Sequence, residues 1–179
     1  MNFEKGHNMD VFEAIKTRRS IRKYKSGLIP DEELKMIFEA ARWAPSAGNR
    51  QPWCFVVVRD AEKRKALAKA ANNQKFLENA TVIITALGDT KISKRWYDKD
   101  PMIAVEHMVL AATALGYGTC WIGAFNEDEV KRLLKIPKEM SVIALLPIGV
   151  SNETLNPRPR KEISEIFFEE EYSKPIGIW

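Results

Sequence analysis

The chain has 179 residues, of which 45% are hydrophobic, so it is long enough for a single domain with a sizeable core. Its 28 lysines and arginines against 24 acidic residues give a net charge of +4, and lysines are interleaved with glutamates in residues 60–69 and 127–138, which argues against a nucleic-acid-binding protein. No apolar run approaches the roughly 20 residues of a membrane span. The first residues lack the apolar core of a signal peptide, so we expect a cytoplasmic protein without a membrane partner.

The hydrophobic pattern predicts helices that alternate with strands in one domain spanning residues 1–179. Helices are expected at Val11–Thr17, from Pro30 through Ala41, at Ala61–Ala71, Pro101–Leu115 and Glu127–Leu134, and near Glu162–Phe168. Strands are expected at Trp53–Val58 and Thr81–Leu87, both buried, and at Thr119–Phe125 and Ser141–Val150, with an extended end at Tyr172–Trp179. This alternation indicates an α/β or α+β fold.

The segment Pro101–Leu115 is apolar on more than one helical face, which predicts a helix that is central to the fold or buried between subunits. His107 lies in this pattern and is expected to be a packed residue. Cys54 and Cys120 lie in apolar segments and are expected to be buried free thiols. Neither has a second Cys or His at ligand spacing, so no metal site is expected.

Three common catalytic or nucleotide-binding fingerprints are absent from the sequence. No G-x-G-x-x-G follows a strand, no G-x-x-x-x-G-K occurs, and no G-x-S-x-G occurs. The chain therefore lacks the usual signatures of a Rossmann dinucleotide site, a P-loop and an α/β-hydrolase nucleophile.

The run APSAGNRQPW at residues 44–53 is a stiff polar loop between a helix and a strand. Pro45 and Pro52 fix two φ angles, whereas Gly48 allows a third to be positive. Side chains of Ser46, Asn49 and Gln51 offer hydrogen bonds between the prolines. An ordinary helix-to-strand connection is the alternative interpretation of this loop.

Two basic clusters are candidate anion sites. The first is RRSIR at residues 18–22, in which three guanidiniums and a hydroxyl suit a phosphate; a basic helix end that complements the helix dipole is the alternative. The second is PRPRK at residues 157–161, where Arg158 and Arg160 share one side of an extended chain; a solvated basic tail is the alternative. A third candidate is the strand and loop at Thr119–Phe125, where Gly123 permits close approach of a flat ligand; a core strand that ends in a glycine turn is the alternative.

These motifs together resemble the FMN-dependent nitroreductase family. RRSIRKY after the first helix, APSAGNRQPW before the first strand, LGYGTCWIGAF after the long helix and the late NPRPRK occur in the order found in that family. The resemblance covers the chain from about Met9 to Ile166, with a short segment between Gly88 and Pro101. It implies a mixed, mainly antiparallel sheet flanked by helices, in an intertwined homodimer whose C-terminal tail, about residues 151–179, wraps the partner.

The resemblance also implies which residues bind FMN. Residues of the first basic cluster match those that hold the FMN phosphate and the pyrimidine side of the flavin ring. Arg158 and Arg160 match further residues that bind the phosphate. The polar loop matches residues beside the flavin of the partner subunit, and two further positions match the backbone beside flavin N5. The implied cofactor-binding residues are Arg18, Arg19, Ser20, Arg22, Pro45, Ser46, Ala47, Asn49, Gln51, Asn72, Ile122, Gly123, Arg158 and Arg160, with Lys75 on a looser alignment.

The function implied by the resemblance is an oxidoreductase. NADH or NADPH gives a hydride to flavin N5, and a nitroaromatic, a quinone or a similar electron-poor acceptor takes the electrons in a ping-pong reaction. Because the cofactor carries the chemistry, no catalytic side chain is expected. Trp96 and Tyr97, in the short central segment, are candidates for a flexible cap over the substrate, with ordinary surface aromatics as the alternative.

Three other functions remain open on the sequence. One is a specialised flavin enzyme, such as a reductive dehalogenase or a flavin-degrading protein, although the short segment between Gly88 and Pro101 leaves little room for a dehalogenase lid. Another is a flavin-binding protein for storage or sensing, which NAD(P)H would not bleach. The last is a small basic module that binds nucleic acid without a flavin.

Overall fold

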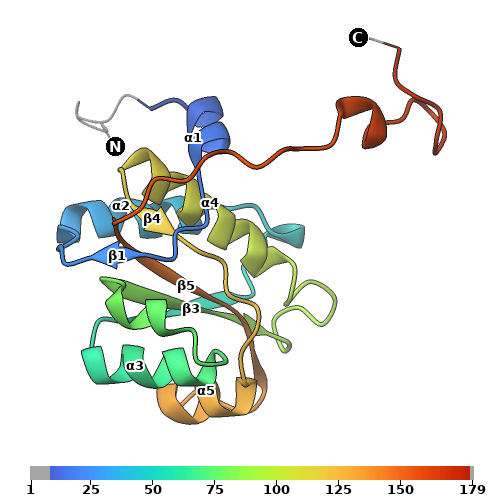
Figure 1. Cartoon of the computed structure of the whole chain (residues 1–179). Helices are drawn as coiled ribbons and strands as arrows, with labels where there is room; N and C mark the ends of the chain where they lie inside the picture. The colour runs from blue at the N-terminus through green and yellow to red at the C-terminus, as the bar shows by residue number, and fades with distance from the viewer. Residues whose placement is uncertain (1–8, 178–179) are drawn as a thin grey trace.

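The computed structural model describes residues 9–177 and places an antiparallel sheet between two helical layers (Figure 1). Within these residues the strand order is β1-β5-β3-β2, and β4 also pairs with β5. The strands are β1 (Tyr24–Lys25), β2 (Trp53–Val58), β3 (Val82–Asp89), β4 (Gly118–Thr119) and β5 (Met140–Ser151). The predicted mixed fold with a mainly antiparallel sheet is therefore confirmed.

Helices α3 and α5 cover one face of the sheet, whereas α2 and α4 cover the other and α1 packs against α4 (Figure 1). Side-chain oxygens of Asp10, Asp60 and Asn126 accept from the backbone N–H three residues later, which fixes the starts of α1, α3 and α5. The helices are α1 (Val11–Thr17), α2 (Asp31–Arg42), α3 (Ala61–Ala70), α4 (Asp100–Ala114) and α5 (Glu127–Leu134). Short 3₁₀ turns lie at Ala47–Asn49, Lys75–Asn79 and Ile163–Glu165.

Strand β3 divides the hydrophobic core in two because it is buried on both faces. Ile83 and Leu87 pack in the core beneath α3 and α5, and the alternate residues Val82, Ile84 and Ala86 pack beneath α2 and α4. This period-2 alternation is what a central strand between two helical layers requires. It explains why the whole segment is apolar.

Thr85 is the polar exception in β3. It is fully buried, and its hydroxyl has no hydrogen-bond partner in the described part of the chain. Replacing it by valine keeps the shape and removes an unsatisfied hydroxyl, so Thr85→Val is expected to raise the free energy of unfolding by about 1 kcal/mol. Urea unfolding measures the change, and a loss of stability would show that the hydroxyl is satisfied in solution.

The strand expected at Thr119–Phe125 is much shorter than predicted. Only Gly118 and Thr119 pair with β5, and beyond them Ile122 alone forms a bridge, with Leu145. The chain leaves the ladder at Trp121, whose indole N–H donates to the Glu106 carboxylate of α4 at 3.0 Å. The hydrogen bond from Trp121 to α4 thus takes the place of continued pairing with β5.

The strand predicted at Trp53–Val58 is present with these bounds as β2, but the expectation that it is buried is wrong, because β2 is an edge strand in which only Val58 is buried. Cys54 on this strand is exposed, whereas Cys120 is buried as predicted. Both thiols are free. His107 is half-buried, with Nδ1 3.0 Å from the Ala40 carbonyl oxygen, which is the packing role expected for it.

The tail after β5 leaves the body of the molecule (Figure 1). The expected helix near Glu162–Phe168 is reduced to one 3₁₀ turn. The end is not extended, because Phe168 bridges Pro175 and its ring meets that of Tyr172 at a centroid separation of 5.1 Å. The last two residues of the predicted extended end lie outside the described residues. Ile166, Phe167 and Tyr172 are each more than half exposed, so this tail buries few of its apolar side chains in its own chain.

Candidate functional site

The RRSIR segment and the segment after α4 lie side by side. Arg18 caps the end of α1, with its N–H bonded to the Ala14 carbonyl at 2.9 Å. Ser20 then forms a parallel bridge with Thr119, and the Ile21 N–H donates to the Thr119 carbonyl at 2.8 Å. Two of the segments singled out in the sequence thus meet at β4.

A third segment joins them through the turn after α3. The Gln74 side-chain amide donates to the Ala124 carbonyl at 3.4 Å, next to Gly123. Asn72 is exposed and holds a positive φ of 56°, and Lys75 is also exposed. Polar residues near Asn72 therefore border the end of the Thr119–Gly123 segment.

Arg19 carries an unsatisfied donor within this region. One terminal nitrogen, Nη1, donates to the carbonyls of Lys16 and Arg18, both at 2.7 Å. Its Nε is buried without a hydrogen-bond partner among the described residues. Buried N–H groups are nearly always paired in folded proteins, so this atom favours a bound group that carries an acceptor oxygen or nitrogen. Arg18 and Ser20 are half-buried beside it, and Arg22 is exposed.

Two titratable side chains beneath this cluster stay neutral at ordinary pH. Burial raises the pKa of the Cys120 thiol, against the opposing effects of Arg22, Ser20 and Arg18. Burial likewise raises the pKa of Tyr24, whose hydroxyl donates to the Ile21 carbonyl at 2.9 Å. Neither group is therefore a ready nucleophile or base, in keeping with a site that binds rather than reacts.

The backbone at Gly123 borders open space, next to the buried Ile122. Ile122 is buried and exchanges two 3.0 Å hydrogen bonds with Leu145, which fixes its position against β5. A Cβ added at Gly123 would meet no atom within 4 Å. A flat group can approach this backbone without displacing any side chain.

The polar loop holds a strained backbone. Gly48, Asn49 and Gln51 all have φ between 50° and 58°, a region that costs non-glycine residues about 1–2 kcal/mol each. The Ser46 hydroxyl accepts from the Gln51 N–H at 2.9 Å, and the Gln51 amide donates to Asn49 Oδ1 at 3.1 Å. Pro45, Asn49 and Gln51 are exposed. This internal network keeps the polar side chains at the surface.

The same loop is tied to α4 and to the end of β3. The Ala47 N–H donates to the buried Asp100 carboxylate at 3.1 Å, and the Asp89 N–H donates to the Pro52 carbonyl at 2.7 Å. Among the described residues no hydrogen bond joins this loop to the Arg18–Arg22 segment. The placement of the loop beside the flavin of a partner subunit stays a prediction.

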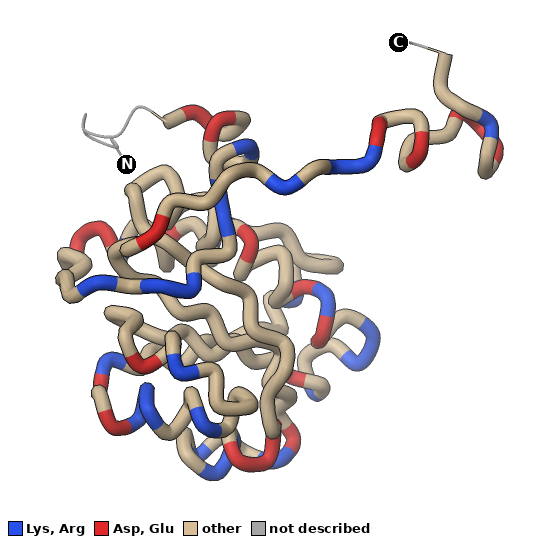
Figure 2. Tube along the Cα trace, in the orientation of Figure 1, with Lys and Arg blue, Asp and Glu red and all other residues tan. Residues whose placement is uncertain are grey.

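Arg158 and Arg160 lie on the exposed tail, as a basic stretch separate from the one after α1 (Figure 2). Arg160 Nη1 donates to the carbonyls of Arg158 and Pro159, at 3.1 and 3.3 Å. The structure therefore does not bring these side chains onto the first cluster. It does join the base of the tail to that cluster, since the Asn152 N–H donates to the Lys23 carbonyl at 2.8 Å.

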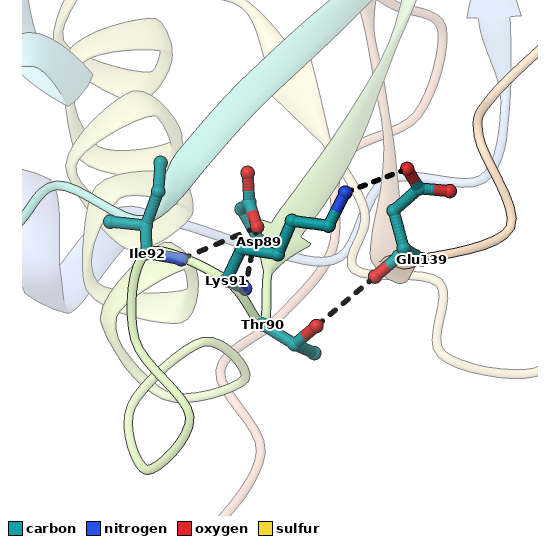
Figure 3. Close-up of polar contacts among 5 residues, drawn as sticks. All are labelled: Asp89, Thr90, Lys91, Ile92 and Glu139. Carbon is teal, nitrogen blue, oxygen red and sulfur yellow. Dashed lines mark hydrogen bonds and ion pairs between the residues drawn. The ribbon is translucent and has the colours of Figure 1, made fainter.

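The segment with Trp96 and Tyr97 is a compact series of turns. Asp89 accepts from the N–H groups of Lys91 and Ile92, and Lys91 Nζ lies 3.0 Å from Glu139 Oε1, which fastens the start of the segment to the turn before β5 (Figure 3). The Tyr97 carbonyl packs directly on Gly88. Both aromatic residues are half-buried, so the role of a flexible cap stays a prediction.

The model of the nitroreductase family matches residues 15–80 and 69–150. A protein from Archaeoglobus fulgidus named "Putative NADH dehydrogenase/NAD(P)H nitroreductase" is 40% identical over 147 residues, which cover 78% of this chain and 84% of that protein. The chain belongs to the nitroreductase family.

Solved structures of nitroreductases and flavin oxidoreductases share its fold. An "FMN-dependent Nitroreductase" from Clostridium difficile has a TM-score of 0.82 and 30% identity, covering 89% of this chain and 98% of that one. The "NADPH:FMN oxidoreductase from Vibrio harveyi complexed with NAD+" has a TM-score of 0.84 and 28% identity, covering 90% and 77%.

A cleft of about 520 Å³ lies elsewhere, between the β1–α2 connection and α3. Its two guanidiniums are engaged, because Arg59 pairs with Asp31 at 2.6 Å and Arg64 donates to the carbonyls of Arg59 and Glu78. The cleft is therefore not a strong anion site in this nitroreductase. No helix within residues 9–177 has the length and hydrophobicity to cross a membrane.

Two carboxylates in the candidate site escaped the sequence interpretation. Asp100 holds the polar loop, and Glu153 accepts from two backbone N–H groups of the first basic cluster. Each is a single acidic residue with partners 53 to 131 positions away in the sequence. A local motif carries no signal for such a contact.

Proposed function

We propose that this nitroreductase is an FMN-dependent oxidoreductase that uses NADH or NADPH to reduce nitroaromatics, quinones or similar electron-poor acceptors by a ping-pong mechanism, as a cytoplasmic homodimer. The coarser class, an NAD(P)H-dependent flavin oxidoreductase, follows from the family and from the activities named for its relatives. The observation that carries the proposal is Arg19 Nε in the RRSIR segment, which is buried and has no hydrogen-bond partner among the described residues.

The residues present fit FMN. Arg18, Ser20 and Arg22 would hold the phosphate and the pyrimidine edge together with Arg19, since guanidiniums match phosphate oxygens with paired donors. Arg158 and Arg160 would add charge from the tail. The open backbone at Ile122 and Gly123 would lie against the ring, with Asn72 near its edge.

When bound, FMN supplies the redox chemistry by accepting a hydride from NAD(P)H and passing electrons on to the acceptor. The chain contributes position and charge. Guanidiniums and backbone N–H groups near the pyrimidine edge favour negative charge that develops there during the reaction. The Ser46–Gln51 loop, with Pro45 and Ala47, would complete the site of the partner subunit.

Two exposed apolar surfaces support the homodimer. On α1, Val11, Phe12 and Ile15 are 57%, 71% and 52% exposed, and on α4 Met102 and Ile103 are also exposed. Helices α1 and α4 also pack against each other. The tail carries the second surface, and its departure from the body suits an arm that wraps a partner copy.

The visible absorption spectrum of the purified protein tests the proposal, before and after anaerobic addition of NADH or NADPH. We expect flavin bands that NADH or NADPH bleaches at least as fast as the enzyme turns over a quinone or nitroaromatic, and that return when such an acceptor is added. A colourless protein that FMN does not reconstitute would contradict it. Bands that NAD(P)H does not bleach would instead favour flavin storage or sensing.

A further inference from the structure

Glu153 places a negative charge beside the cluster proposed to bind phosphate. Its Oε1 accepts from the Arg22 N–H at 2.6 Å and from the Lys23 N–H at 3.0 Å. An acidic side chain next to an anion site opposes binding electrostatically. The two hydrogen bonds indicate a compensating role for Glu153, which is to hold the backbone at Arg22 and Lys23 in place.

Glu153 lies where the two basic segments are joined. β1 pairs with the end of β5, Tyr24 opposite Ser151, and the Asn152 N–H donates to the Lys23 carbonyl at 2.8 Å. The Ser151 hydroxyl also bonds the Glu153 carbonyl at 2.7 Å. Beyond Glu153 no hydrogen bond joins residues 154–158 to the body in the described part of the chain, so this carboxylate is the last hydrogen-bonded tether before Arg158.

The hydrogen bonds of Glu153 limit how far Arg158 and Arg160 can lie from the first basic cluster. Arg158 lies five residues beyond Glu153, which at full extension spans at most about 17–18 Å. With the carboxylate fixed to the N–H groups of Arg22 and Lys23, the tail starts its course at the first basic cluster. Without that bond, both the Arg22 backbone and the start of the tail gain freedom, which phosphate binding would have to remove.

We propose that Glu153 is a positioning residue that fixes the backbone at the end of the RRSIR segment for phosphate binding and anchors the start of the tail that carries Arg158 and Arg160 beside it. The inference rests on the proposed FMN function. It concerns mainly the phosphate, because Glu153 bonds the backbone of the segment proposed to hold it and has no hydrogen bond to Ile122 or Gly123 in the described structure.

The test compares dissociation constants for FMN and for riboflavin, which lacks the phosphate, by titrating apoprotein. Glu153→Ala is expected to weaken FMN binding about tenfold, equivalent to about 1.4 kcal/mol, and to weaken riboflavin binding less. Glu153→Gln keeps the acceptor oxygen and is expected to restore FMN affinity. Asn152→Ala is the matched control, since Asn152 contributes through its main chain, and it should behave as wild type.

Equal weakening of FMN and riboflavin, or no weakening of either, would overturn the role of Glu153. If Glu153→Ala does not fold, Glu153→Asp retracts the same charge by one methylene and is expected to give the same FMN-selective loss. Failure of the wild-type apoprotein to bind FMN would instead overturn the proposed function, so the two failures are distinguishable.

Discussion

Replacing Arg18 or Arg160 by alanine is expected to weaken FMN binding by roughly 10- to 100-fold each. Each change removes a charge-assisted hydrogen-bond donor, and such bonds contribute about 1.5–3 kcal/mol. Fluorescence titration of apoprotein with FMN measures the loss. Because Arg160 lies on an exposed tail and bonds only main-chain carbonyls of its own segment in the described structure, its removal should leave the unfolding temperature unchanged.

Two controls distinguish a specific contact with the phosphate from a nonspecific effect of the protein's net positive charge. Arg132→Ala removes one positive charge from the exposed surface of α5 and should not alter FMN affinity. Lysine at position 18 or 160 keeps the charge without the paired donors and should recover part of the loss. Because both arginines are proposed to contact one phosphate, the double variant should lose less than the sum of the two single effects. Flavin retention equal to wild type in either single variant would refute its phosphate assignment.

The sequence predicted the sheet and its helices because apolar patterns report burial directly. The apolar run at Thr81–Leu87 became the central β3, and the apolar helix expected at Pro101–Leu115 became α4, one residue displaced at each end. Composition does not reveal which other strands and helices pack beside a given strand. Trp53–Val58 has the same β-branched and aromatic residues as a central strand, yet it lies at the sheet edge with Cys54 exposed.

The candidate site was predictable where motifs are local and unpredictable where contacts are distant. RRSIR and the Gly123 region were singled out separately, and the Ser20–Thr119 bridge that joins them follows from the topology. Glu153 binds residues 130 and 131 positions earlier, which no local pattern indicates. Arg158 and Arg160 stay away from the first cluster in this chain, since the tail around them makes few contacts that would fix its path.

Gly88 and Gly123 give opposite expectations for the same substitution. An added Cβ at Gly88 would lie 1.9 Å from the Tyr97 carbonyl oxygen and 3.2 Å from Ile143 Cδ1. The first neighbour is backbone within a segment fastened at both ends, by Glu139 and by Asp100, so it cannot rotate away. Gly88→Ala is therefore expected to cost about 3 kcal/mol of stability, which lowers the unfolding temperature by about 10 °C.

At Gly123 the same methyl group meets no atom within 4 Å, and the backbone is outside the left-handed region. Gly123→Ala should therefore unfold at the wild-type temperature without flavin, while its FMN affinity and turnover fall because the methyl group occupies the space proposed for the ring. Thermal unfolding of both apoproteins measures their stability, and titration with FMN then measures their flavin affinity. Wild-type flavin affinity in Gly123→Ala would place the ring elsewhere, whereas wild-type stability in Gly88→Ala would show that residues 89–100 move as a flexible cap.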